Sequence, residues 1–239
     1  EYGQIHGHDV LLAGEDSLCS AEGGQTAATK VASDPTILGA IGTNCSSAGT
    51  AASTVISEAG MLMISSSNTS PKLTDPNETW NPGYYRTAHN DNFQGAVAAE
   101  FAYNELGART AAALHDGDPY TESLASVFAD VFAGLGGEVT TFEAINKEDT
   151  DMRPVLTTLA DGSPDVLYFP IFEPAGNFVA AQSVEVPGLE NTTLIGADGL
   201  LVSSFGPNTG PAAIGMYLSG PFVSADVKAY ADFLENFDA

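Results

Sequence analysis

The sequence is poor in basic residues. Only 7 of its 239 residues are Lys or Arg, against 31 Asp or Glu, so the formal net charge is −24 at pH 7. A surface this acidic repels phosphate backbones and anionic lipids, which argues against nucleic acid and negatively charged membranes as partners. Two interpretations stay open: ordinary solubility, and life in high salt, where screening relieves the self-repulsion of the acidic surface.

The chain also lacks long apolar runs and the common motifs of catalysis and nucleotide binding. No apolar run approaches the ~20 residues of a membrane-spanning helix. No signal peptide is recognised, and residue 1 is Glu, so we expect a mature or trimmed chain. There is no phosphate-binding G-x-x-x-x-G-K-[ST] loop, no G-x-G-x-x-G after a strand and no G-x-S-x-G elbow. We therefore expect neither an enzyme nor a bound cofactor.

Cysteine and histidine are scarce, with two and four residues. Cys19 and Cys45 are consistent with an oxidised pair in an exported protein or with two buried free thiols, and composition does not separate the two. Nothing in the sequence brings Cys45 to a base such as His115, so a catalytic thiol is disfavoured. His6 and His8 lack the further ligands that a zinc site needs, and we predict no metal site.

What the sequence does contain is a regular alternation of short apolar runs and amphipathic helical patterns. This alternation predicts an α/β fold with parallel sheets covered by helices on both faces. The predicted strands are 9–13, 37–42, 61–65, 111–115, 138–142, 166–170, 193–196 and 216–219. The predicted helices are one that begins after Cys45 and the segments 24–33, 93–106, 121–135, 152–160 and 177–186.

One long segment breaks the alternation. Residues 65–84 are rich in Ser, Thr, Asn and Pro and show no periodicity. Loops of this length inside compact folds are usually functional. A short extended segment, 85–88, and a new helix follow it. We therefore predict a first lobe over 1–89, a second over 90–220, and a return to the first lobe over 221–239.

The residues that follow the strands offer groups for binding a zwitterion, because ligands of open parallel sheets bind beyond the carboxyl ends of the strands. Ser46 begins a helix, where its hydroxyl and free backbone N–H groups suit a carboxylate, and Thr69 could add another hydroxyl. Asp198 could meet an ammonium group. The alternatives are a plain helix cap for Ser46 and an Asx turn before Gly199 for Asp198.

Six segments carry a resemblance to a known family, in order and spacing across nearly the whole chain. They are GTNCSS at 42–47, GMLMIS at 60–65, SNTSPKLT at 67–74, YRT at 85–87, HDGDPY at 115–120 and IGADG at 195–199. Together they resemble the leucine/isoleucine/valine-binding proteins. The resemblance implies a type I periplasmic-binding-protein fold, in which two Rossmann-like lobes close on a ligand in the cleft between them. It also implies that this chain lacks segments that the family has at both ends.

The resemblance assigns roles position by position. Ser46 and Thr69 match residues that bind the ligand carboxylate, Ser67 matches a backbone contact, and Asp198 matches the acidic partner of the ammonium. The same correspondence makes Tyr120 and Phe172 (where the family often has tyrosine) ligand-binding positions, and Cys19 and Cys45 a disulfide pair. Asn68, beside Thr69, is also predicted to bind the ligand.

Ligand choice is where the sequence departs from the family. Asn44 stands where relatives that bind apolar side chains tend to have an apolar residue. A buried amide facing an apolar side chain lacks hydrogen-bond partners, so we predict a ligand with some polar character rather than leucine. Glu173 could add a polar contact. The alternative is that Asn44 turns away and bonds to the backbone of the 65–84 loop.

Together with these features, the resemblance implies an extracytoplasmic solute-binding protein. It would capture an amino acid or related small carboxylate and deliver it to the permease of an ABC transporter. We expect a monomer in the periplasm or outside the cell, with a lipid anchor ahead of residue 1 as an option. The alternative is the ligand-sensing domain of a receptor or regulator with the same fold.

Overall fold

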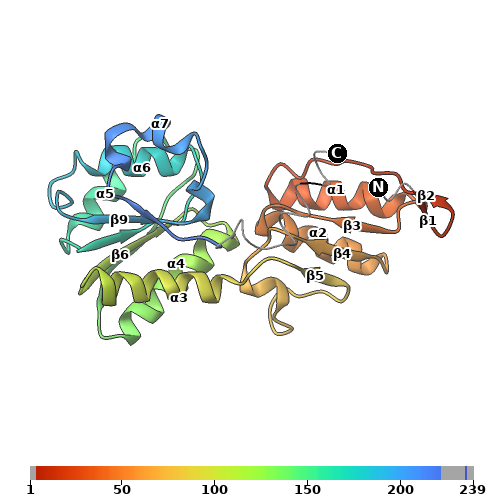
Figure 1. The fold of residues 1–239 in the computed structure, drawn as a ribbon, viewed down its shortest axis with the longest axis horizontal. Helices are drawn as coiled ribbons and strands as arrows, with labels where there is room; N and C mark the ends of the chain where they lie inside the picture. Colours follow the sequence, from red (N-terminus) through yellow and green to blue (C-terminus); the bar gives the residue numbers. More distant parts are fainter. Residues whose placement is uncertain (1–3, 222–234, 236–239) are drawn as a thin grey trace. The chain divides into compact units, whose positions relative to one another are not determined.

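The computed structural model describes residues 4–221 and residue 235 (Figure 1). The chain divides into two compact units, unit 1 up to Ala88 and unit 2 from His89 onward. The return to the first lobe predicted for 221–239 lies, apart from Pro221 and Glu235, outside the described residues. No helix within the described ranges is long and apolar enough to cross a membrane.

Unit 1 is built on a three-stranded parallel sheet of β3 (Gly39–Ile41), β4 (Leu62–Ser65) and β5 (Tyr84–Arg86), in that order. Helices α1 (Ala21–Ser33) and α2 (Ser46–Glu58) pack on each other, and α2 also contacts β4. They enclose a small core with the strands and the 3-10 turn η1 (Pro71–Thr74) of the long loop. That core consists of Ala28, Ala52, Ile56, Met63, Leu73 and Tyr84.

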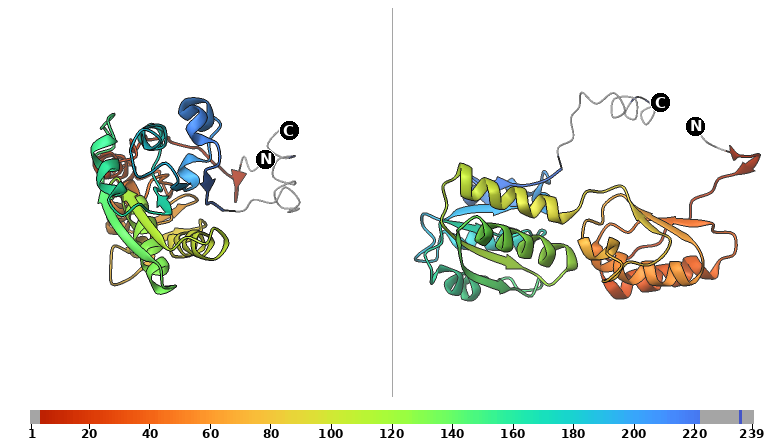
Figure 2. Two further views of the ribbon diagram at one scale, coloured as in Figure 1. Left: turned by 90° about the vertical axis from the view of Figure 1, so that its left-hand side faces the viewer. Right: turned by 90° about the horizontal axis from the view of Figure 1, so that it is seen from below.

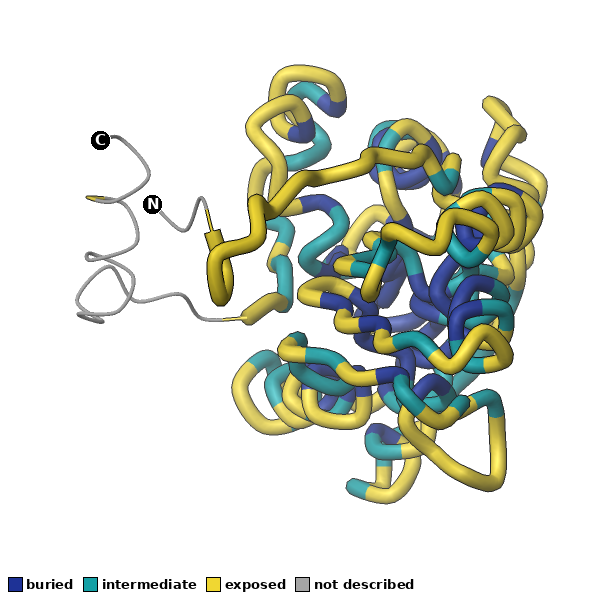
Figure 3. The backbone as a smooth tube through the Cα atoms, turned by 90° about the vertical axis from the view of Figure 1, so that its right-hand side faces the viewer, coloured by how far each residue is buried: buried dark blue, intermediate teal, exposed yellow. Residues whose placement is uncertain are grey.

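The strand predicted at 9–13 is wrong. Only Asp9 of this segment is in a strand, as the last residue of a short antiparallel hairpin of β1 (Gln4–Ile5) and β2 (His8–Asp9). Residues 10–13 form no regular structure (Figure 2). Leu11 and Leu12 are 88% and 93% exposed, and the segment is drawn as exposed in Figure 3. In the described part of the chain this apolar run pairs with no strand, and β3 pairs only with β4.

Within the described residues, helices cover one face of the unit 1 sheet, and not both faces as predicted. Side chains of alternating residues leave opposite faces of a strand. Met63 and Tyr84 point into the core, whereas Ile41, Ile64 and Tyr85 on the other face are 87%, 42% and 57% exposed. No described helix covers this apolar face, so only the α1–α2 side of the sheet has the predicted cover.

Unit 2 follows the predicted architecture closely. Its parallel sheet has the order β10-β9-β8-β6-β7. Helices α5 and α6 lie on one face and α3 and α4 on the other (Figure 1), each with a buried apolar core. The strands are β6 (Thr110–His115), β7 (Glu138–Ala144), β8 (Val166–Tyr168), β9 (Thr193–Gly196) and β10 (Tyr217–Leu218). The helices are α3 (Asp91–Glu100), α4 (Pro119–Gly134), α5 (Arg153–Ala160), α6 (Ala175–Ser183) and α7 (Phe205–Thr209).

Helix α3 positions part of the candidate site. The predicted segment 93–106 is α3 followed by a π-helical turn, η2 (Phe101–Glu105). Its buried side carries Gln94 and Gly95, and a Cβ on Gly95 would lie 2.9 Å from Val127 of α4. Glycine therefore permits a close helix–helix approach that holds Gln94 against the unit. The apolar residues Phe93 and Val97 of α3 face outward and are 73% and 61% exposed.

Candidate functional site

In unit 1 the candidate residues gather after β3 and β4. Cys19 and Cys45 form a disulfide with their Cα atoms 5.2 Å apart, which confirms the pairing implied by the resemblance and excludes Cys45 as a thiol nucleophile. The bridge ties the segment before α1 to the residue that precedes α2. The start of α2 is therefore anchored covalently.

Ser46, the first residue of α2, and Thr69, in the loop after β4, are both buried. Ser46 is 2% exposed, and its Oγ accepts a hydrogen bond from the Ser70 N–H at 3.3 Å. It is the first residue of α2 with Cys45 as the cap, so the plain-cap interpretation is wrong. Thr69 is 4% exposed, and its Oγ1 has no hydrogen-bond partner among the described residues. A buried hydroxyl beside the unpaired N–H groups of a helix start suits an anion.

Asn68 holds the loop in place. It is fully buried, and its Oδ1 accepts hydrogen bonds from Thr43 Oγ1 at 3.3 Å and from the Tyr84 hydroxyl at 3.1 Å. A Cβ on Gly49 of α2 would lie 2.4 Å from that oxygen, so the helix approaches Asn68 as closely as only glycine allows. Asn68 therefore connects α2, β5 and the segment after β3, and supports the neighbouring Thr69.

Asn44 and Ser67 are exposed and linked to each other. The Ser67 hydroxyl donates to the Asn44 carbonyl at 2.9 Å, and the Ser67 N–H donates to Ser65 Oγ at 3.1 Å. The Asn44 side chain makes no hydrogen bond within the described part of the chain. Its contact with the long loop thus runs through its own backbone carbonyl, and its predicted role in ligand choice stays a prediction.

In unit 2 the structure brings Tyr120, Phe172 and Asp198 together, although they are far apart in sequence. Asp198 begins the short turn η3 (Asp198–Leu200) directly after β9, and Tyr120 lies in the first turn of α4. The Tyr120 hydroxyl donates to Asp198 Oδ1 at 2.8 Å. The Tyr120 and Phe172 rings are tilted against each other with centroids 5.2 Å apart. Aromatic rings beside a half-buried carboxylate are a favourable setting for an organic cation.

The Asp198 side chain accepts its hydrogen bonds from residues far away in the sequence, and not from its own turn. Its Oδ1 accepts from Gln94 Nε2 at 2.6 Å as well as from Tyr120, residues 104 and 78 positions away. The Asx-turn alternative is therefore wrong. Burial, followed by the negative charge of Asp198, raises the pKa of Tyr120 well above its ordinary value, so this hydroxyl keeps its proton and donates.

Glu173, which could have added a polar contact, is engaged within its own unit. Its carboxylate accepts hydrogen bonds from Asn177 at 2.9 Å, Ser204 at 2.5 Å and Asn208 at 3.2 Å. These donors, Ser204 first, lower the pKa of Glu173. The carboxylate ties α6 to the α7 region, so we do not include it in the candidate site.

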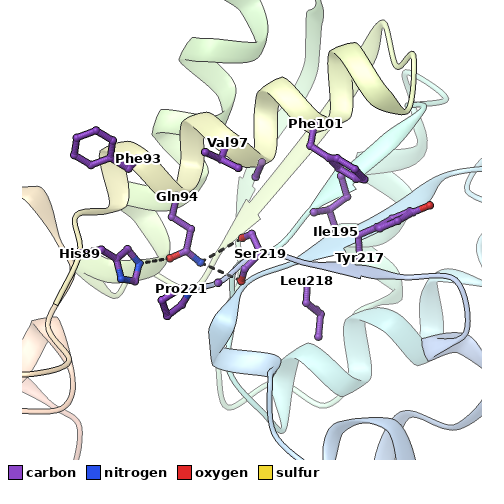
Figure 4. Close-up of a pocket in the computed structure, with 12 residues that line it drawn as sticks. His89, Phe93, Gln94, Val97, Phe101, Ile195, Tyr217, Leu218, Ser219 and Pro221 are labelled. Carbon is purple, nitrogen blue, oxygen red and sulfur yellow. Dashed lines mark hydrogen bonds between the residues drawn. The ribbon is translucent and has the colours of Figure 1, made fainter. Parts of the chain in front are cut away.

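A pocket of about 670 Å³ in unit 2, missed by the sequence analysis, lies between α3 and β10 (Figure 4). One side is apolar, with Val97 and with Phe101 packed edge-on against Tyr217 at 5.0 Å. The polar end is formed by His89, Gln94 and Ser219. Only the helical spacing of the apolar residues marked this surface in the sequence, and that spacing is equally typical of a core-facing helix.

The acidic residues after β6 have structural roles. Asp118 caps α4 by accepting from the Tyr120 N–H at 2.9 Å, and Asp116 accepts from the Asp118 N–H at 3.1 Å. Across the described residues, no group of three or more His, Cys, Asp or Glu side chains is arranged to hold a metal ion. The chemistry that the clusters offer is thus recognition of organic charges by hydroxyls, helix N–H groups and one carboxylate.

Comparison with known proteins finds relatives along the whole chain. A family model described as periplasmic binding protein matches residues 1–239. The Leu/Ile/Val-binding protein BraC3 of Rhizobium johnstonii is 30% identical over 235 residues, covering 97% of this chain and 62% of the relative. The chain spans 48% to 62% of the length of the curated relatives it matches.

Solved structures share the fold. The leucine-binding protein LivK of Thermotoga maritima superimposes with a TM-score of 0.89 at 23% identity, covering 98% of this chain and 66% of that one. A solute-binding protein of an R. palustris ABC transporter, in complex with benzoate, superimposes with a TM-score of 0.82 at 20% identity, covering 99% and 64%. The expected α/β fold of the type I periplasmic binding proteins is thereby confirmed.

Proposed function

Because the chain belongs to the periplasmic binding protein family, we propose that it is the ligand-binding part of an extracytoplasmic solute-binding protein for an amino acid or related small carboxylate. Taken by itself, unit 1 offers groups suited to a carboxylate, namely Ser46, Thr69 and the N-terminal N–H groups of α2. Taken by itself, unit 2 offers Asp198 for an ammonium group, beside the rings of Tyr120 and Phe172. An ABC-transporter permease is the partner that receives the ligand.

The observation that supports this proposal most directly is the environment of the Asp198 carboxylate. Its carboxylate is half-buried at the carboxyl end of β9, and two neutral donors approach Oδ1. Among the described residues no cationic side chain pairs with it. A partly desolvated carboxylate without a cation favours a positively charged ligand group. Benzoate, the ligand in one structural neighbour, has no such group and would leave Asp198 without a charged partner.

Ligand choice forms the finer part of the proposal. The exposed amide of Asn44 precedes the carboxylate-binding start of α2. A ligand side chain with a hydrogen-bonding group would satisfy that amide. An apolar side chain that excluded water from the amide would leave it unpaired, at a cost of about 1–3 kcal/mol. We therefore propose a preference for a polar amino acid such as glutamine over leucine.

Calorimetric titration tests the charge requirement directly. L-glutamine, L-leucine and L-valine would each be compared with their amides and with the analogues that lack the ammonium group. We expect at least one free amino acid to bind, and both modified forms to bind far more weakly. Equal affinity for acid and amide would remove the carboxylate site, and equal affinity for the deaminated analogue would remove the role of Asp198.

The specificity proposal has its own test in the same titrations. Glutamine should bind more tightly than leucine, and Asn44→Leu should reverse or abolish that difference. Leucine binding tightest, with an affinity that Asn44→Leu leaves unchanged, would contradict the role of Asn44. The receptor alternative makes the same binding predictions, and is distinguished by whether the binding protein stimulates a permease reconstituted in vesicles.

A further inference from the structure

A hydrogen-bond chain in unit 2 begins at His89 and runs through Gln94 (Figure 4). His89 Nε2 and Gln94 Oε1 are 2.5 Å apart. An amide oxygen carries no hydrogen, so in this pair the imidazole N–H is the donor. This contact fixes which end of the Gln94 amide faces His89 and turns its NH₂ group the other way.

The NH₂ group of Gln94 has three acceptor atoms on two different segments. One is Asp198 Oδ1 at 2.6 Å, and the other two are the carbonyl and hydroxyl oxygens of Ser219, just after β10, at 3.2 Å and 3.3 Å. The Gln94 side chain is 6% exposed on the buried side of α3, where Gly95 permits close contact with α4. A buried amide with these partners on both sides is held in one orientation.

The two donors to Asp198 converge on a single oxygen. Gln94 Nε2 and the Tyr120 hydroxyl both approach Oδ1, at 2.6 Å and 2.8 Å. No described residue donates a hydrogen bond to Oδ2. The donors come from α3 and α4, on one side of the sheet, so they fix the rotation of the carboxylate as well as its position.

We infer that Gln94 is a positioning residue for Asp198: it locks the carboxylate by Oδ1 and so reserves Oδ2 for the ammonium group of a ligand. The inference rests on the proposed function, in which Asp198 is the partner of that ammonium. A preoriented acceptor binds more tightly because the ordering of the side chain does not have to occur on binding. His89 acts indirectly, because it orients the amide of Gln94, which in turn holds Asp198.

Gln94→Met tests this inference, because methionine keeps the length of the side chain and removes both hydrogen-bonding ends. The probes are L-glutamine, L-leucine and L-valine, together with 4-carbamoylbutanoate, 4-methylpentanoate and 3-methylbutanoate, which lack the ammonium group. We expect binding of the amino acids to weaken roughly tenfold, and binding of the deaminated analogues by less than about threefold.

Gln182→Met is the matched control. Gln182 is also an amide that joins two segments of unit 2, accepting from the Met152 N–H at 2.6 Å and donating to the Thr150 carbonyl at 2.8 Å. It contacts neither Asp198 nor the pocket, so its replacement should leave the affinity for all six compounds unchanged. If Gln94→Met does not fold, His89→Phe is the second variant, with the same ligand-selective loss expected at about threefold.

A double-mutant cycle separates positioning from general destabilisation. In an Asp198→Asn background, Gln94→Met should change amino-acid affinity by less than about threefold, since the charge it serves is gone. An equal loss in both backgrounds, or an equal loss for both kinds of compound, would overturn the inference alone. A wild-type protein that binds none of the six compounds would overturn the proposed function and the inference with it.

Discussion

At the residue scale, the close contact between Gly49 and Asn68 requires that residue 49 has no side chain. Gly49→Ala would place a Cβ 2.4 Å from Asn68 Oδ1. We expect a net loss of about 1–3 kcal/mol in the free energy of unfolding, because a well-packed site has no room for the added carbon. Urea denaturation measures it.

The control for this substitution is Gly134→Ala in α4, where a Cβ would meet nothing within 4 Å. It should be neutral or stabilising by up to ~1 kcal/mol, because alanine is the better helix former. A Gly49→Ala protein as stable as the Gly134→Ala protein would show that the close approach of α2 to Asn68 is unimportant.

Single residues at strand ends were predictable from the sequence, whereas their partners were not. Ser46 and Asp198 could be singled out because each follows an apolar run and begins a new turn or helix. Gln94 reaches Asp198 across 104 residues, and no local pattern encodes such a pairing. The family resemblance identified Asp198, and only the structure connects it to Gln94.

At the scale of elements, the disulfide secures the start of α2. Cys19 and Cys45 are separated by 26 residues, and closing a loop of this size in the unfolded chain is worth about 3 kcal/mol by chain-entropy reasoning. We expect reduction, or the pair of substitutions Cys19→Ser and Cys45→Ser, to lower the free energy of unfolding by that amount.

The bridge is tested by urea denaturation with and without reductant, alongside mass spectrometry after alkylation without reductant. The Cys19→Ser/Cys45→Ser protein is the control, since its stability should not respond to reductant. Two alkylated thiols in the untreated protein, or identical stability in both conditions, would contradict the account.

Elements buried on both faces were predicted best. The segments 166–170 and 193–196 are continuous apolar runs, and they form β8 and β9 in the middle of the unit 2 sheet. The run at 9–13 is also largely apolar but pairs with no strand in the described part of the chain. Strand formation requires a hydrogen-bonding neighbour, which an apolar run alone does not specify.

At the scale of the whole molecule, charge is the dominant property. The net charge is −24. Among the described residues few carboxylates are paired with a basic side chain, as Glu15 is with Lys30 and Glu185 is with Arg153. Raising KCl from about 0.1 M to about 1 M shortens the screening length from about 10 Å to about 3 Å. We expect the melting temperature to rise over this range, because repulsion between carboxylates weakens.

Differential scanning calorimetry at constant pH measures this dependence. Choline chloride provides the control, since a rise that depends on ionic strength alone should be the same for both salts. A melting temperature that stays constant or falls as salt is added would contradict the interpretation of the acidic surface as a source of instability, and would leave solubility as its role.

The central claim is that Asp198 binds the cationic end of an amino acid. Its most direct test is calorimetric titration of the wild type, Asp198→Ala and Glu173→Ala with the amino acid that binds the wild type most tightly. Glu173 is the control because its carboxylate serves α6 and the α7 region. We predict a loss of ~2–5 kcal/mol for Asp198→Ala and unchanged affinity for Glu173→Ala. A loss of less than about tenfold for Asp198→Ala would contradict the claim.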